Sequence, residues 1–181
     1  AAAGAAPSSA SASAPSGADD AVDEHRHLSL DGVLASSKVA EMLDIVQGCQ
    51  ARHEKVVIFS QFASTLQAAC DALSAQGISY VSITGAMTSV RRHRIVQTFT
   101  NNPNVSVIIL SIRVGSVALT LTAANHVIFL EPCSNSSSEQ QASNRVFRIG
   151  QTKDVHIHTL VAANTVEEFI YEMNLRRRDR D

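Results

Sequence analysis

The segment Lys55-Val56-Val57-Ile58-Phe59 places four apolar residues in a row after one lysine, and it has the length of a β-strand. A strand that is apolar at every position, rather than at alternate positions, is typical of a strand buried on both faces. Such strands occur in parallel sheets whose two faces are covered by helices. The segment therefore predicts a central strand of a parallel sheet.

Helical and strand-like patterns alternate around this segment. Apolar residues recur every three or four positions after Ser36, Ser64 and Ser89, as amphipathic helices require. A capping-box sequence at 165–168 predicts the start of a last helix. Further strands are predicted at 78–84, 105–110, 126–130 and 155–161. This alternation predicts a three-layer α/β fold, in which helices flank a central, mainly parallel sheet.

Composition divides the 181 residues into three parts. Residues 1–27 are rich in Ala and Ser and end with acidic residues and two histidines, so we expect a disordered linker. Residues 28–175 are expected to form one domain, and residues 176–181 a charged, solvated tail. The chain begins with Ala and lacks the features of a signal peptide, so we interpret it as part of a longer protein.

The overall charge and the apolar runs restrict the possible partners. The formal net charge is −2, so any nucleic-acid binding must come from a local basic patch. No apolar run approaches the roughly 20 residues that span a bilayer, so no membrane association is expected.

Neither the cysteines nor the histidines show the spacing of a metal site. Cys49, Cys70 and Cys133 lie far apart and are interpreted as reduced thiols. The pairs 25/27 and 156/158 are histidines without further ligands at zinc-site spacing. We therefore expect no metal site, and we expect His156 and His158 to lie exposed on an edge strand.

Polar residues follow the predicted strands at the points where ligands collect in parallel sheets, which are the carboxyl ends of the strands. Backbone N–H groups at the helix start after Ser111, together with Arg113, would suit a phosphate group. Such an edge could follow a sugar–phosphate backbone by charge and shape. These residues are Ser60, Gln61, Thr84, Gly85, Ser111 and Arg113.

The segment 139–151 reads E-Q-Q-A-S-N-R-V-F-R-I-G-Q and holds Arg145 and Arg148 three residues apart. On a helix these positions share a face, so both guanidinium groups could point at one anion. The alternative is a pair of solvated arginines near a helix end. The chain has no Gly-rich phosphate loop with an adjoining lysine and no acidic pair suited to magnesium. The sequence therefore lacks the phosphate loop and the acidic pair that would hold a nucleoside triphosphate and its magnesium ion.

Four blocks, in this order, resemble the second RecA-like lobe of the Swi/Snf-type DNA translocases within helicase superfamily two. They are K-V-V-I-F-S-Q-F at 55–62, T-G-A-M-T-S-V-R-R at 84–92, S-I-R-V-G-S-V-A-L-T-L at 111–121 and Q-A-S-N-R-V-F-R-I-G-Q at 141–151. The R-I-G-Q ending is the most specific of these, and the resemblance covers roughly residues 28–173. It implies that residues 28–175 form a RecA-like helicase C-terminal lobe.

The resemblance implies roles for particular residues. Arg145 and Arg148 match arginine fingers that approach the γ-phosphate of ATP. The ATP and its magnesium ion would be held mainly by a first lobe absent from this sequence. Predicted nucleotide contacts are Gly115, Gln141, Arg145, Arg148 and Gln151. Predicted DNA-backbone contacts are Ser60, Gln61, Thr84, Gly85, Arg92, Ser111 and Arg113.

The chain departs from the family pattern at 115–120, where G-S-V-A-L-T stands in motif five, and at 131–134, where E-P-C-S stands before motif six. Phe147 also occupies a position where histidine is common. Several departures resemble the branch that joins the translocase to linker-histone, PHD and RING ubiquitin-ligase modules. That branch implies the ubiquitin-conjugation machinery as a further partner.

The leading hypothesis is the C-terminal lobe of a nuclear, ATP-dependent translocase that acts on double-stranded DNA or nucleosomes, in chromatin remodelling or DNA repair. It needs the first lobe as its partner, and we do not expect this chain to hydrolyse ATP alone. One alternative is a non-catalytic DNA- or protein-binding module that retains the fold. A DEAD-box-like RNA helicase lobe fits less well, because motif six of that family reads differently.

Overall fold

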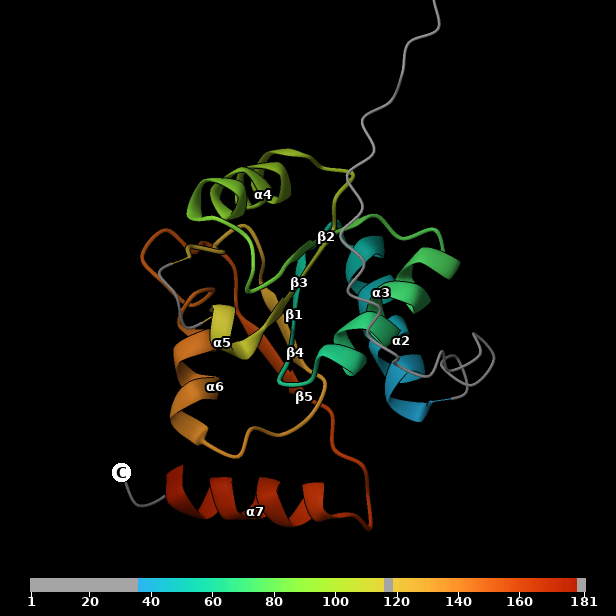
Figure 1. The fold of residues 1–181 in the computed structure, drawn as a ribbon, viewed down its shortest axis with the longest axis vertical. Coiled ribbons are helices and arrows are strands. Elements are labelled where there is room, and N and C mark those ends of the chain that lie inside the picture. Colours follow the sequence, from blue (N-terminus) through green and yellow to red (C-terminus); the bar gives the residue numbers. More distant parts are fainter. Residues whose placement is uncertain (1–35, 116–118, 179–181) are drawn as a thin grey trace, which may run out of the picture.

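The computed structural model describes residues 36–115 and 119–178, which form a five-stranded sheet between two layers of helices (Figure 1). Every strand pairing is parallel, and the strand order is β2-β3-β1-β4-β5. The elements are α2 (Ser37–Ala51), β1 (Val56–Ser60), α3 (Ala63–Ala75), β2 (Tyr80–Ile83), α4 (Ser89–Asn101), β3 (Val107–Ser111), α5 (Ile112–Gly115), β4 (His126–Phe129), α6 (Ser136–Ser143), β5 (His156–Thr159) and α7 (Val166–Arg178). The predicted three-layer α/β fold is confirmed.

Strand β1 lies at the centre of the sheet, as its apolar sequence predicts. Val57 pairs with Ile108 of β3 on one side and with Val127 of β4 on the other. All five residues of β1 are buried. Because both faces and both edges of β1 are covered, no position on it can be polar without an internal partner.

Alternate residues of β1 belong to two separate cores. Val56 and Ile58 pack with α2 and α3, on the right of the sheet in Figure 1. Val57 and Phe59 pack with apolar residues of α4, α5 and α6 on the other side. Each fully buried side chain of this size contributes about 1.5–3 kcal/mol. The strand β1 therefore joins the two cores through the sheet.

Helix α7 is attached through polar contacts at both ends. Near its start, Glu167 forms an ion pair with Lys38 of α2, and Lys38 Nζ also donates to the carbonyl oxygen of Leu130 at 2.9 Å. Farther along, Asn174 Nδ2 donates to the carbonyl oxygen of Cys133 at 2.6 Å. Phe169 on the same helix is 62% exposed.

The carboxyl-terminal limit of the domain differs from the predicted one. Helix α7 continues to Arg178, so the predicted start of a solvated tail at residue 176 falls inside a helix. The predicted linker at residues 1–27 lies outside the described residues. None of the helices in 36–115 and 119–178 is both long enough and apolar enough to cross a membrane.

Gly115, at the end of α5, lies directly against the ring of Phe59. A Cβ atom at Gly115 would lie 2.4 Å from Phe59 Cε1. The ring has little freedom to move, because it is fully buried and stacks on Phe129 with ring centroids 5.4 Å apart. Gly115 therefore serves the packing of β1 against α5.

We predict that Gly115→Ala lowers the free energy of unfolding by about 1–3 kcal/mol, the usual cost of overpacking a filled core. Urea denaturation of the chain measures this as a lower transition midpoint with an unchanged slope. Gly85→Ala is the matched control, since a Cβ atom at that position would meet none of the described residues within 4 Å. Equal midpoints for the two variants would contradict the packing role.

Candidate functional site

Three of the loops that carry predicted site residues lie side by side at the carboxyl edge of the sheet. Ser60 at the end of β1 is in register with Ser111 at the end of β3. Ile83 at the end of β2 is in register with Leu110, so Thr84 emerges on the other side of the β3 loop. The strand order therefore brings together residues that are up to about fifty positions apart in the sequence.

Ser60 does not lie on the surface of this edge. Its side chain is fully buried, and Oγ donates to the Glu131 carboxylate at 2.9 and 3.0 Å from its two oxygens. The Gln61 backbone N–H donates to the same carboxylate. In this structure the Ser60 hydroxyl is buried with an internal partner, and its contact with DNA stays an untested prediction. Its hydroxyl holds the loop after β1 against the loop after β4.

Glu131 is a residue of this edge for which the sequence predicted no role. It is buried, and burial raises the pKa of its carboxyl group, while the bonds from Gln61 and Ser60 partly oppose that rise. The only sequence signal for this buried acid is its place in the Glu131-Pro132 pair, directly after β4. Its partners could be identified only once β1 and β4 were known to be neighbours.

Gln61 and Arg113 line one cavity of about 290 Å³ between the β1, β3 and β4 loops. Both residues are exposed, so the structure leaves their side chains accessible from solvent. Gln61 Nε2 donates to the carbonyl oxygen of Pro132 at 3.4 Å, which sets its direction along the cavity wall. The remaining lining residues are Phe62, Ile112, Cys133, Ser134, Asn135 and Ser138.

Helix α5 follows β3 directly and is described over Ile112–Gly115, and Ser111 Oγ accepts from the Val114 N–H at 3.4 Å. One of the few N-terminal amides is thus already bonded within the chain. The phosphate contact of this helix start stays a prediction, and Arg113 is the charged group of the loop.

Thr84, Gly85 and Arg92 form a second part of the edge. Thr84 and Gly85 are exposed, and Arg92 Nη2 donates to the Gly85 carbonyl oxygen at 2.8 Å. Arg92 also lines an open groove of about 580 Å³ along α4. Its other lining residues are Ser89, Val90, His93, Arg94, Gln97 and Leu119. With two arginines and no acidic residue among these described residues, the walls of the groove favour an anion.

Arg145 and Arg148 lie beyond the end of α6, not on it. The helix ends at Ser143, and the backbone continues in tight turns, such as Arg145 N–H to the carbonyl oxygen of Ala142 at 3.1 Å. Gly150, with φ of 104°, closes these turns in a conformation that L-residues rarely adopt. The prediction that the two arginines share a helix face is therefore wrong. They occupy one compact turn instead.

This arginine turn (145–151) is hydrogen-bonded to residues 121–124, which precede β4. The Leu121 N–H donates to the Arg145 carbonyl oxygen at 2.9 Å, and Gln151 Nε2 donates to the Ala124 carbonyl oxygen at 2.6 Å. Gln151 Oε1 accepts from the N–H groups of residues 152 and 153. Both polar atoms of Gln151 are thus used within the chain. These bonds position the turn, and the nucleotide contact of Gln151 stays a prediction.

The side chain of Arg148 remains accessible on this turn. It is exposed, and its Nη1 donates to the hydroxyl of Thr120 at 3.0 Å. Thr120 is a neutral partner, and no ion pair joins Arg148 to a carboxylate within the described residues. Its charge is therefore available to an external anion. Arg145 is half-buried beside it, and Gln141 is exposed on α6.

On the edge strand β5, one of the two histidines that were predicted to be exposed is half-buried. His156 is exposed on edge strand β5, as predicted, but His158 is half-buried. The His158 Nε2 atom lies 3.3 Å from Nδ1 of the buried His126. The prediction for His158 was wrong because its side chain faces the neighbouring strand β4 rather than solvent.

We predict that Glu131→Gln becomes relatively more stable than the parent chain as pH rises from about 4 to about 7. Burial places the folded-state pKa of Glu131 above its unfolded value. Its contribution to stability is therefore fully present below the unfolded pKa and is lost as pH rises through the folded pKa. Glutamine lacks this titration and retains an oxygen that accepts from Gln61. Denaturation of both chains at the two pH values gives the difference in stability. A difference that is independent of pH would contradict the prediction.

Comparison with known proteins places this geometry in a family. Residues 31–150 match the model of the helicase conserved C-terminal domain. The chain is 40% identical over 124 residues to the DNA repair protein rad8 of Schizosaccharomyces pombe, covering 68% of the chain and 11% of that protein. It is 32% identical over 147 residues to the ATP-dependent helicase ULS1 of Saccharomyces cerevisiae, covering 80% of the chain and 9% of that protein.

Solved structures agree with this match. The crystal structure of the C-terminal part of the Fun30 ATPase domain superposes with a TM-score of 0.77 at 28% identity, covering 80% of this chain and 46% of that one. The matched family region includes strands β1 to β4, their carboxyl-edge loops and the arginine turn up to Gly150. The chain belongs to the helicase conserved C-terminal domain family, and within it to the Swi/Snf-type helicases.

Proposed function

We propose that this chain is the second RecA-like lobe of an ATP-dependent translocase that moves on double-stranded DNA. The observation that carries the proposal is the arginine turn (145–151). It presents the exposed guanidinium of Arg148 from a backbone that Gln151 and Leu121 hold in place. A charged group on a fixed support, with no counter-charge among the described residues, suits an anion supplied by a second domain.

ATP and magnesium fit this chain only in part. Arg145 and Arg148 supply positive charge, but the chain contains no Gly-rich phosphate loop with a lysine. In the proposed role, the first lobe holds the nucleotide and this lobe adds its arginines when the two close together. Arginines in this position stabilise the charge that spreads over the transferring phosphoryl group.

The proposed DNA contacts lie along the carboxyl edge of the sheet. Gln61 and Arg113 share one cavity there, and Arg92 is hydrogen-bonded to Gly85 beside the α4 groove. Thr84 is exposed and Ser111 is half-buried between these two places. Hydroxyl, amide and guanidinium donors in such a row match contacts to phosphate oxygens, which position a protein without reading sequence.

The chain spans 11% of rad8 and 9% of ULS1, so the activity of the whole protein is a proposal. The names DNA repair protein rad8 and Protein CHROMATIN REMODELING 24, the latter from Arabidopsis thaliana, support a role in DNA repair or chromatin remodelling. A nuclear location and DNA or nucleosome partners follow from that role. The link to the ubiquitin-conjugation machinery stays a prediction from motif resemblance.

A non-catalytic binding module that keeps the fold is the second candidate. The departures from the family pattern at Ala118 and Ser134 favour it. It shares the DNA-contacting edge with the leading proposal and lacks the ATP chemistry. The two candidates therefore differ in one measurable property, which is DNA-stimulated ATP hydrolysis.

We predict that a fused protein, with a Swi/Snf-type first lobe placed before this chain, hydrolyses ATP in a DNA-stimulated reaction. Arg148→Ala should lower its turnover by about three to five orders of magnitude, the usual worth of an arginine finger. Arg148→Lys should recover only part of this, because an ammonium group lacks the planar fork of a guanidinium. Steady-state ATP hydrolysis with and without duplex DNA measures all three proteins.

Arg176→Ala is the matched control, since Arg176 is an exposed arginine on α7 that pairs with Glu172 at 3.4 Å. It should leave turnover unchanged. Equal turnover in the Arg148→Ala variant would overturn the assignment of the finger. A fused protein that binds DNA but shows no stimulated hydrolysis would favour the non-catalytic module.

We predict that the chain binds duplex DNA with an affinity that falls as salt rises, because phosphate contacts release counterions. Arg113→Ala should weaken binding for all DNA sequences alike and reduce the slope of log affinity against log salt by about 1. Fluorescence anisotropy at several salt concentrations measures the slope. A slope reduced equally by Arg176→Ala would show that general charge, rather than the carboxyl edge, binds DNA.

A further inference from the structure

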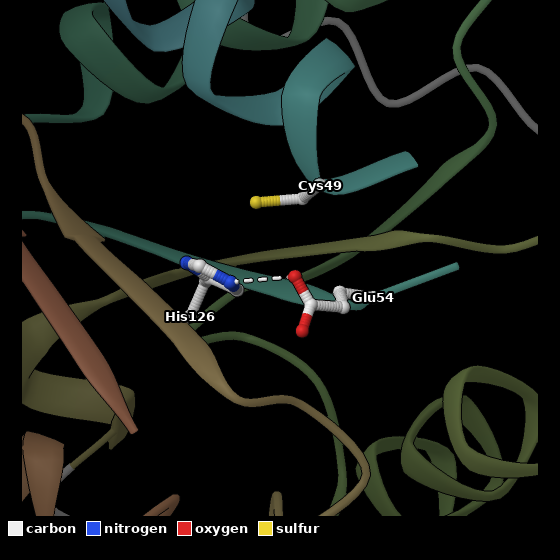
Figure 2. A group of neighbouring side chains, drawn as sticks. All are labelled: Cys49, Glu54 and His126. Atoms are coloured by element: carbon white, nitrogen blue, oxygen red, sulfur yellow. Dashed lines mark hydrogen bonds and ion pairs between the residues drawn. The ribbon is translucent and has the colours of Figure 1, made fainter. Parts of the chain in front are cut away.

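A cluster of three potential metal ligands lies at the amino-terminal edge of the sheet. Cys49 comes from the last turn of α2, Glu54 from the loop before β1, and His126 from the start of β4. The register of β1 and β4, in which Val56 pairs with His126, brings the loop and the histidine together. Figure 2 shows the thiol, the carboxylate and the imidazole turned toward a common point.

The geometry of the cluster suits one small cation. The ligand atoms of the three residues all lie within 4.8 Å of one another, and His126 Nε2 is 3.0 Å from Glu54 Oε2. Ligand atoms around a tetrahedral zinc ion lie about 3.5 Å apart, given the usual Zn–S and Zn–N distances. Convergence therefore needs movements of about 1 Å at the Cys49 side.

A positive charge already lies against two of the three groups. Arg52 Nε donates to Glu54 Oε2 at 2.8 Å, and Arg52 Nη2 donates to Cys49 Sγ at 3.7 Å. The side chain of Arg52 is 56% exposed, so it can turn into solvent when another cation takes its place. The cluster thus favours positive charge, and a metal ion can replace the guanidinium group of Arg52 that now supplies it.

Surrounding groups hydrogen-bond to the ligands and orient them, as groups around the ligands of metal sites commonly do. Asn125 Nδ2 donates to Glu54 Oε1 at 2.8 Å, which leaves Oε2 directed toward His126. His158 Nε2 lies 3.3 Å from His126 Nδ1 and can accept its proton, which leaves His126 Nε2 free to bind a metal.

We propose that Cys49 Sγ, Glu54 Oε2 and His126 Nε2 bind one zinc ion, with water as the fourth ligand. The combination of sulfur, nitrogen and oxygen donors is one that zinc takes in tetrahedral sites. On binding, the Cys49 S–H bond breaks and its proton passes to solvent. His126 loses the Nε2 proton that it donates to Glu54 and takes up one at Nδ1, which donates to His158 Nε2, so the imidazole stays neutral. The His126–Glu54 hydrogen bond is replaced by two bonds to the ion. The ion joins α2 to β4 and to the loop before β1, so its binding stabilises the folded domain.

The experiment is a titration of the reduced, metal-free chain with Co²⁺, followed by displacement with Zn²⁺. We expect saturation at one equivalent, a thiolate-to-cobalt charge-transfer absorption, and a higher thermal midpoint with Zn²⁺. Cys49→Ser should abolish the charge-transfer band, and Cys70→Ser, which changes a half-buried thiol outside the cluster, should keep it. A band that persists in Cys49→Ser would overturn the proposal, as would the absence of binding.

A second variant tests the site without disturbing a buried ligand. Arg52→Ala removes the exposed competing cation, so we expect it to bind Co²⁺ and Zn²⁺ several-fold more tightly than the parent chain. All titrations are repeated in a chain that carries His25→Ala and His27→Ala, so that this histidine pair cannot supply the signal. An Arg52→Ala affinity equal to or weaker than that of the parent would show that the cluster is only a hydrogen-bonded network.

Discussion

Burial of β1 on both faces and along both edges is the constraint on which the rest of this structure depends. The strand forms ladders with β3 and β4, and its side chains alternate between the two cores. Both helical layers therefore pack against the same strand, through four of its residues. The central position of β1 also explains the glycine at position 115. Helix α5 passes the buried Phe59 ring so closely there that a Cβ atom would clash with it.

The two ends of β1 carry the two chemically different regions of the domain. At the carboxyl end, Ser60 and the Gln61 N–H bind the buried Glu131, which fixes the loops after β1 and β4. At the amino end, Glu54 meets His126 and Cys49. Because the strand is rigid and central, both sites are held by the same ladder while facing opposite edges of the sheet.

The arginine turn illustrates how support and function are divided between residues. Gln151 and the backbone of Arg145 use their hydrogen-bonding capacity to fasten the turn to residues 121–124. Arg148 is left exposed, with a neutral hydroxyl of Thr120 as its neighbour. Family membership gives this arrangement a context, since the match to the helicase conserved C-terminal domain extends into the turn as far as Gly150. The same context makes the domain dependent on a partner lobe for the proposed chemistry.

The sequence by itself determined the fold class, the order of the elements and the family. Apolar periodicity and motif order are local properties, and they survive without knowledge of which strands are neighbours. The interior position of β1 could be predicted for the same reason, because the apolar run at 56–59 suits a strand that is buried on both faces.

Only the tertiary structure decided which polar groups are free and which are used internally. Ser60 and Gln151 have the residue types of ligand contacts, yet both are consumed by partners that lie far away in the sequence or across a turn. The end of α6 before Arg145, the burial of His158 and the cluster of Cys49 with Glu54 and His126 were likewise beyond the sequence. Each depends on strand register and on contacts between distant segments, and hydrogen-bond satisfaction is settled by those contacts rather than by residue type.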